Sequence, residues 1–191
     1  MTGEGLEIGT MALFEALSKS ELAVVREVMT AAEWRAGEEV YSLGDPGGSM
    51  FAVVEGAIEI YSIVSGVEKL FMTVREGQVF GLLSILDAGN RPGNARALEP
   101  TRALVMERGG LDQLLDRHPE IGVKVMRGLG NTLGQRVRML TEQFEATIAW
   151  TLEVTGLTSL NLERLMTERI EVTVETTRGE PLTGSLLRFE S

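Results

Sequence analysis

The stretch Ala36-Gly-Glu-Glu-Val-Tyr-Ser-Leu-Gly-Asp-Pro-Gly-Gly-Ser-Met-Phe-Ala-Val-Val-Glu-Gly56 decides the fold class. Two short runs rich in β-branched and aromatic residues, 40–41 and 50–54, stand between turns built from glycine, proline and aspartate. Glycine and proline punctuate strands because they adopt backbone conformations that other residues avoid. The stretch therefore predicts two short strands joined by a tight glycine-rich loop.

The same pattern extends outward over residues 34–107. Further apolar runs occupy 57–61, 69–74 and 103–106, separated by glycine turns at 65–66, 76–77 and 88–90. Many short strands at close spacing favour a small antiparallel barrel over a parallel sheet with crossover helices. The predicted fold class is α+β, mainly β: an antiparallel β-roll or jelly roll flanked by helices.

Helical spacing brackets this β region on both sides. Residues 11–30 predict two short helices, with Ser18 and Glu21 forming a capping box between them. A short helix over 111–115 ends before His118-Pro119, where proline favours the first turn of the next helix. One long helix follows, with an apolar stripe at Ile121, Val125, Leu129, Leu133, Val137, Leu140 and Phe144.

Composition excludes several classes of function. The 191 residues include 18 Lys+Arg and 28 Asp+Glu, a net charge of −10 that disfavours nucleic-acid binding by the whole chain. With no cysteine and one histidine, thiolate metal sites, cysteine nucleophiles and multi-histidine zinc sites are excluded. No catalytic or metal-ligating set is identified. No membrane span or signal peptide is predicted, so we expect a cytoplasmic protein.

The C-terminal segment differs from the rest of the chain. A short helix is predicted near 160–165, and Ile170, Val172 and Val174 alternate with polar residues as in a half-buried strand. A second strand is predicted over 182–189. Because a lone hairpin is marginal in water, it must pack on the roll or on another chain, and an unknown protein partner is one candidate. We expect two domains, residues 1–145 and a small β-rich segment, 146–191.

Residues 13–140 resemble the cyclic-nucleotide-binding domain of the cyclic-AMP receptor protein superfamily. The matching strings are Ala36-Gly-Glu, the loop 41–51, Val54-Glu-Gly56, Gly77-Gln-Val-Phe-Gly81, and 96–120 from Arg-Ala-Leu-Glu to Arg-His-Pro-Glu. The resemblance implies a β-roll with two helices before it and two after it. It also implies a homodimer through the long helix, with candidate interface residues Val125, Leu129, Leu133, Val137 and Leu140.

The family's ligand cassette is only partly present. Arg91 stands where the family's arginine pairs with a cyclic phosphate. Leu82 replaces the glutamate that accepts the ribose hydroxyl, a loss on the order of 1.5–3 kcal/mol. Pro92 supplies neither the small hydroxyl nor the N–H expected after the arginine. The candidate ligand-binding residues are Phe80, Gly81, Leu82, Ser84, Asn90, Arg91, Pro92 and Gly93.

Two functions remain open at this point. The first is a non-enzymatic regulatory module with a degenerate phosphate cassette, requiring no cofactor. The alternative is a ligand sensor that binds a cyclic nucleotide or another small anion through Arg91. The family's DNA-binding helix-turn-helix does not follow the long helix. Residues 165–189 instead show a partial resemblance to the opening half of an Sm-like fold, so no direct DNA contact is expected.

Overall fold

The computed structural model describes residues 8–155, 171–175 and 181–185. Packing divides the chain into two compact units, residues 1–136 and 137–191. The division falls inside the long helix, and the expected domain boundary at 145 stays a prediction. No helix in the described ranges is long and apolar enough to cross a membrane.

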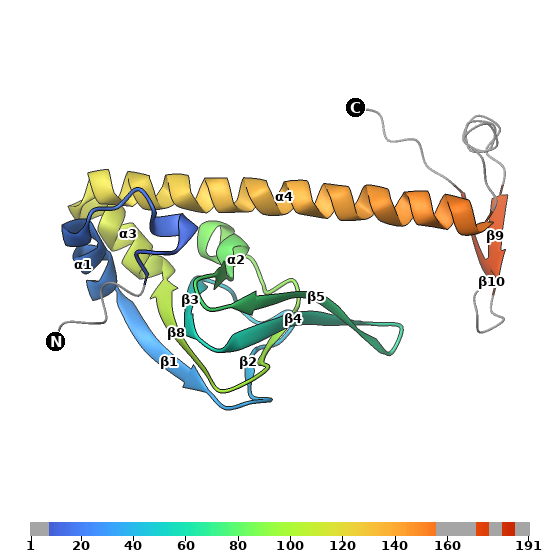
Figure 1. Ribbon diagram of the computed structural model, residues 1–191, viewed down its shortest axis with the longest axis horizontal. Helices are drawn as coiled ribbons and strands as arrows, with labels where there is room; N and C mark the ends of the chain where they lie inside the picture. The colour runs from blue at the N-terminus through green and yellow to red at the C-terminus, as the bar shows by residue number, and fades with distance from the viewer. Residues whose placement is uncertain (1–7, 156–170, 176–180, 186–191) are drawn as a thin grey trace. The chain divides into compact units, whose positions relative to one another are not determined.

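The first unit contains a β-roll of two antiparallel four-stranded sheets (Figure 1). One sheet has the order β1-β8-β3-β6 and the other the order β2-β7-β4-β5. The strands are β1 Met29–Trp34, β2 Glu39–Tyr41, β3 Ser49–Glu55, β4 Ala57–Val64, β5 Val67–Arg75, β6 Val79–Phe80, β7 Asn94–Ala97 and β8 Thr101–Glu107. The predicted antiparallel roll is confirmed, with β1, β6 and β7 in addition to the expected strands.

Strand β3 is buried on both faces and separates two apolar cores. Phe51 and Val53 point into a core between the two sheets, together with Phe80. Met50 and Ala52 point the other way, into a larger core shared with the helices. This alternation follows from the two-residue period of a strand, and it explains why β3 reads as a continuous apolar run.

The helices gather at one end of the roll (Figure 1). They are η1 Ala12–Phe14, α1 Lys19–Glu27, α3 Arg108–Arg117 and the beginning of α4 Pro119–Thr155, while α2 Leu82–Asp87 lies in the loop after β6. The capping box of α1 forms as predicted, with Glu21 N–H donating to Ser18 Oγ at 3.3 Å. Glu21 also accepts from Lys124 Nζ at 2.7 Å, which joins α1 to α4.

The apolar stripe of α4 is used differently from the expectation. Val125 and Leu129 are 0% exposed and belong to the core of the same chain. Leu133 is partly buried against that core. Val125 and Leu129 therefore have no area left for a second chain, and the expected interface is corrected to exclude them. Val137 and Leu140 are 60% and 63% exposed.

Two glycines of α4 allow close packing, while a third faces open space. A Cβ on Gly128 would overlap the carbonyl oxygen of Leu13, and one on Gly122 would lie 2.9 Å from Leu115 Cα. A Cβ on Gly130 would meet nothing within 4 Å. The first half of α4 thus packs closely against η1 and α3.

The second unit contains the rest of α4 and a hairpin. Strand β9 Glu171–Glu175 pairs antiparallel with β10 Pro181–Ser185, with Val172 opposite Gly184. The two predicted strands are confirmed over these residues. The helix predicted near 160–165, Ile170 and the strand residues after Ser185 lie outside the described residues.

Candidate functional site

Arg91 is fixed by backbone hydrogen bonds to the glycine-rich loop before β3. Its N–H donates to the carbonyl of Asp45, and its own carbonyl accepts from the N–H of Gly44, both at 2.9 Å. The loop also covers α2, since a Cβ on Gly47 would overlap Ser84 and Gly89. The glycine motif that predicts the fold therefore also holds the arginine in place.

The guanidinium of Arg91 lies against aromatic rings inside the roll. Nη1 donates to Ser49 O at 2.9 Å, and Nη2 donates to Ser49 Oγ at 2.7 Å. Its Cζ stands 4.3 Å from the ring centroid of Tyr41 and 5.3 Å from that of Phe51. Phe51 in turn stacks on Phe80 at 4.6 Å. Such cation–π contacts stabilise a buried guanidinium only in part.

No carboxylate neutralises this buried charge. Arg91 is 4% exposed, its Nε has no hydrogen-bond partner, and none of the ion pairs in the described part of the chain involves it. Burial lowers the pKa of Arg91, with weaker opposite influences from Tyr41 and Asp45. An arginine does not lose its proton in a protein, so an uncompensated buried cation costs on the order of several kcal/mol.

Arg96 shows what a compensated arginine looks like in the same roll. It forms ion pairs with Glu59 at 2.8 Å and Glu68 at 2.6 Å, and its Cζ lies 4.6 Å from the Tyr61 ring centroid. These two carboxylates raise the pKa of Arg96. Arg96 is therefore a structural residue of the second sheet, whereas Arg91 has the same ring contact without the carboxylates.

A second arginine approaches the rings from α4. Arg136 donates from Nη2 to the carbonyl of Val79, and burial lowers its pKa. Burial raises the pKa of Tyr41, and both Arg91 and Arg136 oppose that shift electrostatically. The phenol of Tyr41 therefore lies within the influence of two guanidinium groups.

The candidate residues do not all meet at Arg91. A Cβ on Gly81, whose φ is +77°, would lie 2.9 Å from Arg91 Nη1, and Phe80 joins through the ring stack. Gly93 is buried against β4, where a Cβ would stand 3.1 Å from Tyr61 O. Asn90 and Pro92 are exposed.

Leu82 and Ser84 are buried in α2. Leu82 is 2% exposed and belongs to the core shared with the helices, whereas Phe80 belongs to the core between the sheets. Ser84 is also 2% exposed and lies beneath Gly47. A binding role for either side chain stays a prediction.

Sequence reasoning missed Tyr41, Ser49, Phe51 and Arg136 as site residues. The first three lie in the string that carries the resemblance, but the spacing of the glycines does not indicate that their side chains contact Arg91. Trp34 also joins this cluster, with its ring edge-on to Phe51 at 6.0 Å. The signal in the sequence is the pair of aromatic residues, Tyr41 and Phe51, at the two ends of the glycine-rich loop.

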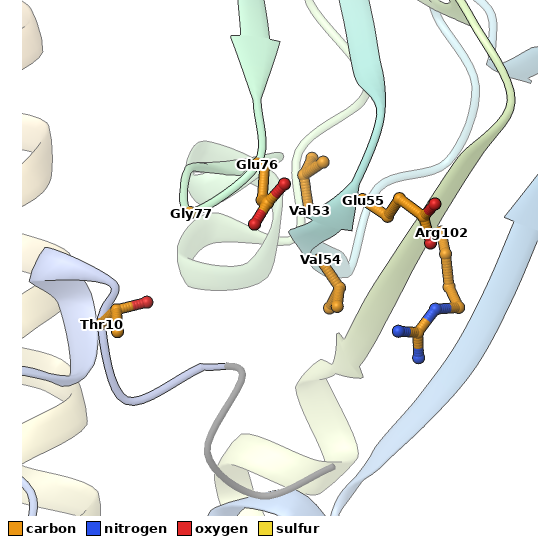
Figure 2. Close-up of a pocket in the computed structure, with 7 residues that line it drawn as sticks. All are labelled: Thr10, Val53, Val54, Glu55, Glu76, Gly77 and Arg102. Atoms are coloured by element: carbon orange, nitrogen blue, oxygen red, sulfur yellow. The ribbon is translucent and has the colours of Figure 1, made fainter. Parts of the chain in front are cut away.

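Two cavities lie elsewhere on the roll. One of about 610 Å³ is lined by Thr10, Val53, Val54, Glu55, Glu76, Gly77 and Arg102 (Figure 2). Another of about 500 Å³ shares Glu55 and Arg102 with it. Figure 2 shows these two side chains lying close to each other. Neither cavity is lined by any of the candidate ligand-binding residues.

Comparison with known proteins identifies similar sequences and folds. Residues 31–118 match the family model described as cyclic nucleotide-binding domain. The chain is 27% identical over 122 residues to the CRP-like cAMP-activated global transcriptional regulator of Mycobacterium tuberculosis, covering 63% of this chain and 54% of that protein. It thus spans about half the length of this relative.

Solved structures share the roll. The cyclic nucleotide-binding domain from Methylobacillus flagellatus gives a TM-score of 0.70 at 23% identity, covering 75% of this chain and 83% of that one. The Thermus thermophilus catabolite activator protein gives a TM-score of 0.65 at 25% identity, covering 71% and 62%.

Proposed function

We propose that this chain, which contains a cyclic nucleotide-binding domain of the cyclic-AMP receptor protein superfamily, is a non-enzymatic regulatory module that senses a small anion at Arg91. The anion would be a cyclic nucleotide or another phosphate-bearing molecule. The relative from M. tuberculosis is named as cAMP-activated and as a transcriptional regulator, which supports a regulatory role.

The observation that carries this proposal is the unneutralised charge of Arg91. Its side chain is 4% exposed, its Nε is unpartnered, and its contacts are a serine and two rings. An anion would supply the missing counter-charge and accept from the free N–H. Guanidinium groups suit phosphate oxygens because their donors form a planar fork.

A second candidate function is a regulatory scaffold that binds no ligand. Both terminal nitrogens of Arg91 already donate to Ser49. Leu82 lies in an apolar core, and Pro92 has no N–H to offer. In this alternative the cassette is degenerate and the arginine serves only to pack Tyr41.

The output of the module is proposed to be assembly of two copies through α4. Val137, Leu140 and Phe144 are large, exposed and spaced three and four residues apart, which places them on one helical face. A self-complementary apolar face at a two-fold axis is the usual basis of a homodimer. The C-terminal segment is proposed to contact a protein partner rather than DNA.

Calorimetric titration of the full chain with cyclic AMP and cyclic GMP separates sensor from scaffold. We expect micromolar binding, and we expect Arg91→Gln to weaken it by roughly ten- to a hundredfold, because a charge-assisted hydrogen bond is lost. Arg75→Gln, on an exposed arginine of β5, is the matched control and should leave binding unchanged. Millimolar or absent binding of every phosphate ligand tested would favour the scaffold.

A further inference from the structure

A second cation, the partly buried Arg136, lies close to the site. Arg136 reaches from α4 to the carbonyl of Val79, the first residue of β6. Arg91 Nη1 lies 2.9 Å from the Cβ position of Gly81, two residues further along the same backbone. The two guanidinium groups therefore flank one short stretch of chain, residues 79–81.

Neither guanidinium has a carboxylate partner among the residues described. Arg136 donates to the Val79 carbonyl, and Arg91 contacts Ser49 and the rings. Asp45 is the one carboxylate that influences the pKa of Arg91, and it is exposed and accepts from Ser42 N–H instead. Two guanidinium groups without a paired carboxylate thus lie close to residues 79–81, in a chain whose total charge is −10.

We infer that Arg136 is a specificity-determining residue that makes this site select a dianionic phosphate monoester over a monoanionic cyclic phosphate. The inference rests on the proposed function and names the ligand class of the same site. A monoanion can neutralise one of the two guanidinium groups, whereas a phosphate monoester carries a second charge above its second pKa of about 6.

The missing ribose anchor of the cassette agrees with this assignment. The ribose acceptor is replaced by Leu82, which is buried in an apolar core. Without that hydrogen bond, the ribose contributes less to the binding energy of a nucleotide. Recognition then depends on the phosphate charge, to which both arginines contribute.

Calorimetry at pH 8 with adenosine 5′-monophosphate and cyclic AMP tests the inference, because the two share base and sugar and differ in phosphate charge. We expect the monophosphate to bind the full chain at least tenfold more tightly. Inorganic phosphate is a third probe that distinguishes a phosphate site from a nucleotide site. At pH 5 the monophosphate is mainly monoanionic, and its advantage should disappear.

Substitutions assign the preference to one side chain. Arg136→Gln should reduce monophosphate affinity by roughly tenfold or more and leave cyclic AMP affinity within about threefold. Arg136→Lys, which keeps the charge, should retain part of the preference. Arg127→Gln is the control, since Arg127 is an exposed arginine of the same helix.

The outcomes separate this inference from the proposed function. If cyclic AMP binds as tightly as the monophosphate, and the binding depends on Arg91, the proposed function stands and the role of Arg136 is wrong. The same holds if Arg136→Gln weakens both ligands equally in a variant that melts like the wild type. If none of the three probes binds, both proposals are wrong.

Discussion

Two alanine substitutions in α4, two residues apart, should change stability in opposite directions. At Gly128 the new Cβ would overlap the backbone carbonyl oxygen of Leu13, whereas at Gly130 it would meet nothing within 4 Å. Both positions are helical, so both gain about 1 kcal/mol in helix propensity when glycine becomes alanine. The pair therefore isolates the packing cost of a single methyl group.

The magnitudes follow from the contacts. Gly130→Ala should stabilise the protein by about 1 kcal/mol. Gly128→Ala carries the same gain but adds an overpacking cost of about 1–3 kcal/mol. We expect the upper end, because a backbone carbonyl cannot rotate away, and hence a net loss of about 2 kcal/mol. For a chain of this size 1 kcal/mol corresponds to about 2–4 °C in Tm.

Urea unfolding of the full chain, followed by circular dichroism, measures both variants against the wild type. Equal slopes with respect to urea would show that the substitution changes stability without changing the surface exposed on unfolding. We expect the midpoint of Gly128→Ala below that of the wild type and the midpoint of Gly130→Ala above it. A Gly128→Ala protein as stable as Gly130→Ala would refute the close approach of Leu13 to α4.

Three further predictions concern assembly, pH and ligand affinity. Leu140→Asp should convert the dimer to a monomer, as measured by light scattering. The control Gln135→Asp, at an exposed position of the same helix, should leave the dimer intact. If both variants remain dimeric, the interface lies elsewhere. Hydrogen bonds from Lys124 and from Ser18 together lower the pKa of Glu21 from 4.5 to about 2. Its stabilising contribution is therefore present above pH 4.5 and lost as the pH falls towards 2, and Glu21→Gln should flatten the dependence of Tm on pH in that window. Pro92→Ala returns an N–H to the loop and should raise phosphate affinity by about threefold to tenfold in calorimetry; no gain would mean that the N–H does not face the ligand.

Much of the fold follows from local signals. The capping box at Ser18, the helix start at Pro119 and the glycine turns of the roll all lie where the sequence predicts them. Strand β1 was missed because residues up to 30 continue the helical spacing of α1. Its position depends on pairing with β8, where Met29 lies opposite Met106, and nothing local encodes that partner.

The site was only partly predictable for the same reason. Arg91 is identified through the family resemblance, because it stands where the family's cassette, which begins at Phe80-Gly81, has its arginine. Its ring partner Tyr41 lies far away in sequence, and only folding brings them together. The interface was overextended because helical periodicity shows which face of α4 is apolar but not what covers it. Val125 and Leu129 turn out to be covered by the chain's own core.

The placement of the two tryptophans gives each compact unit its own optical label. Trp34 packs edge-on to Phe51, in the ring cluster that holds Arg91, whereas Trp150 is 64% exposed on α4. A shielded indole emits at shorter wavelength and is reached slowly by a soluble quencher, while an exposed one emits further to the red. An anion entering beside Tyr41 would therefore alter the blue component of the emission, and association along α4 would alter the red one. Ligand binding and assembly can thus be followed in one cuvette, without attaching a dye.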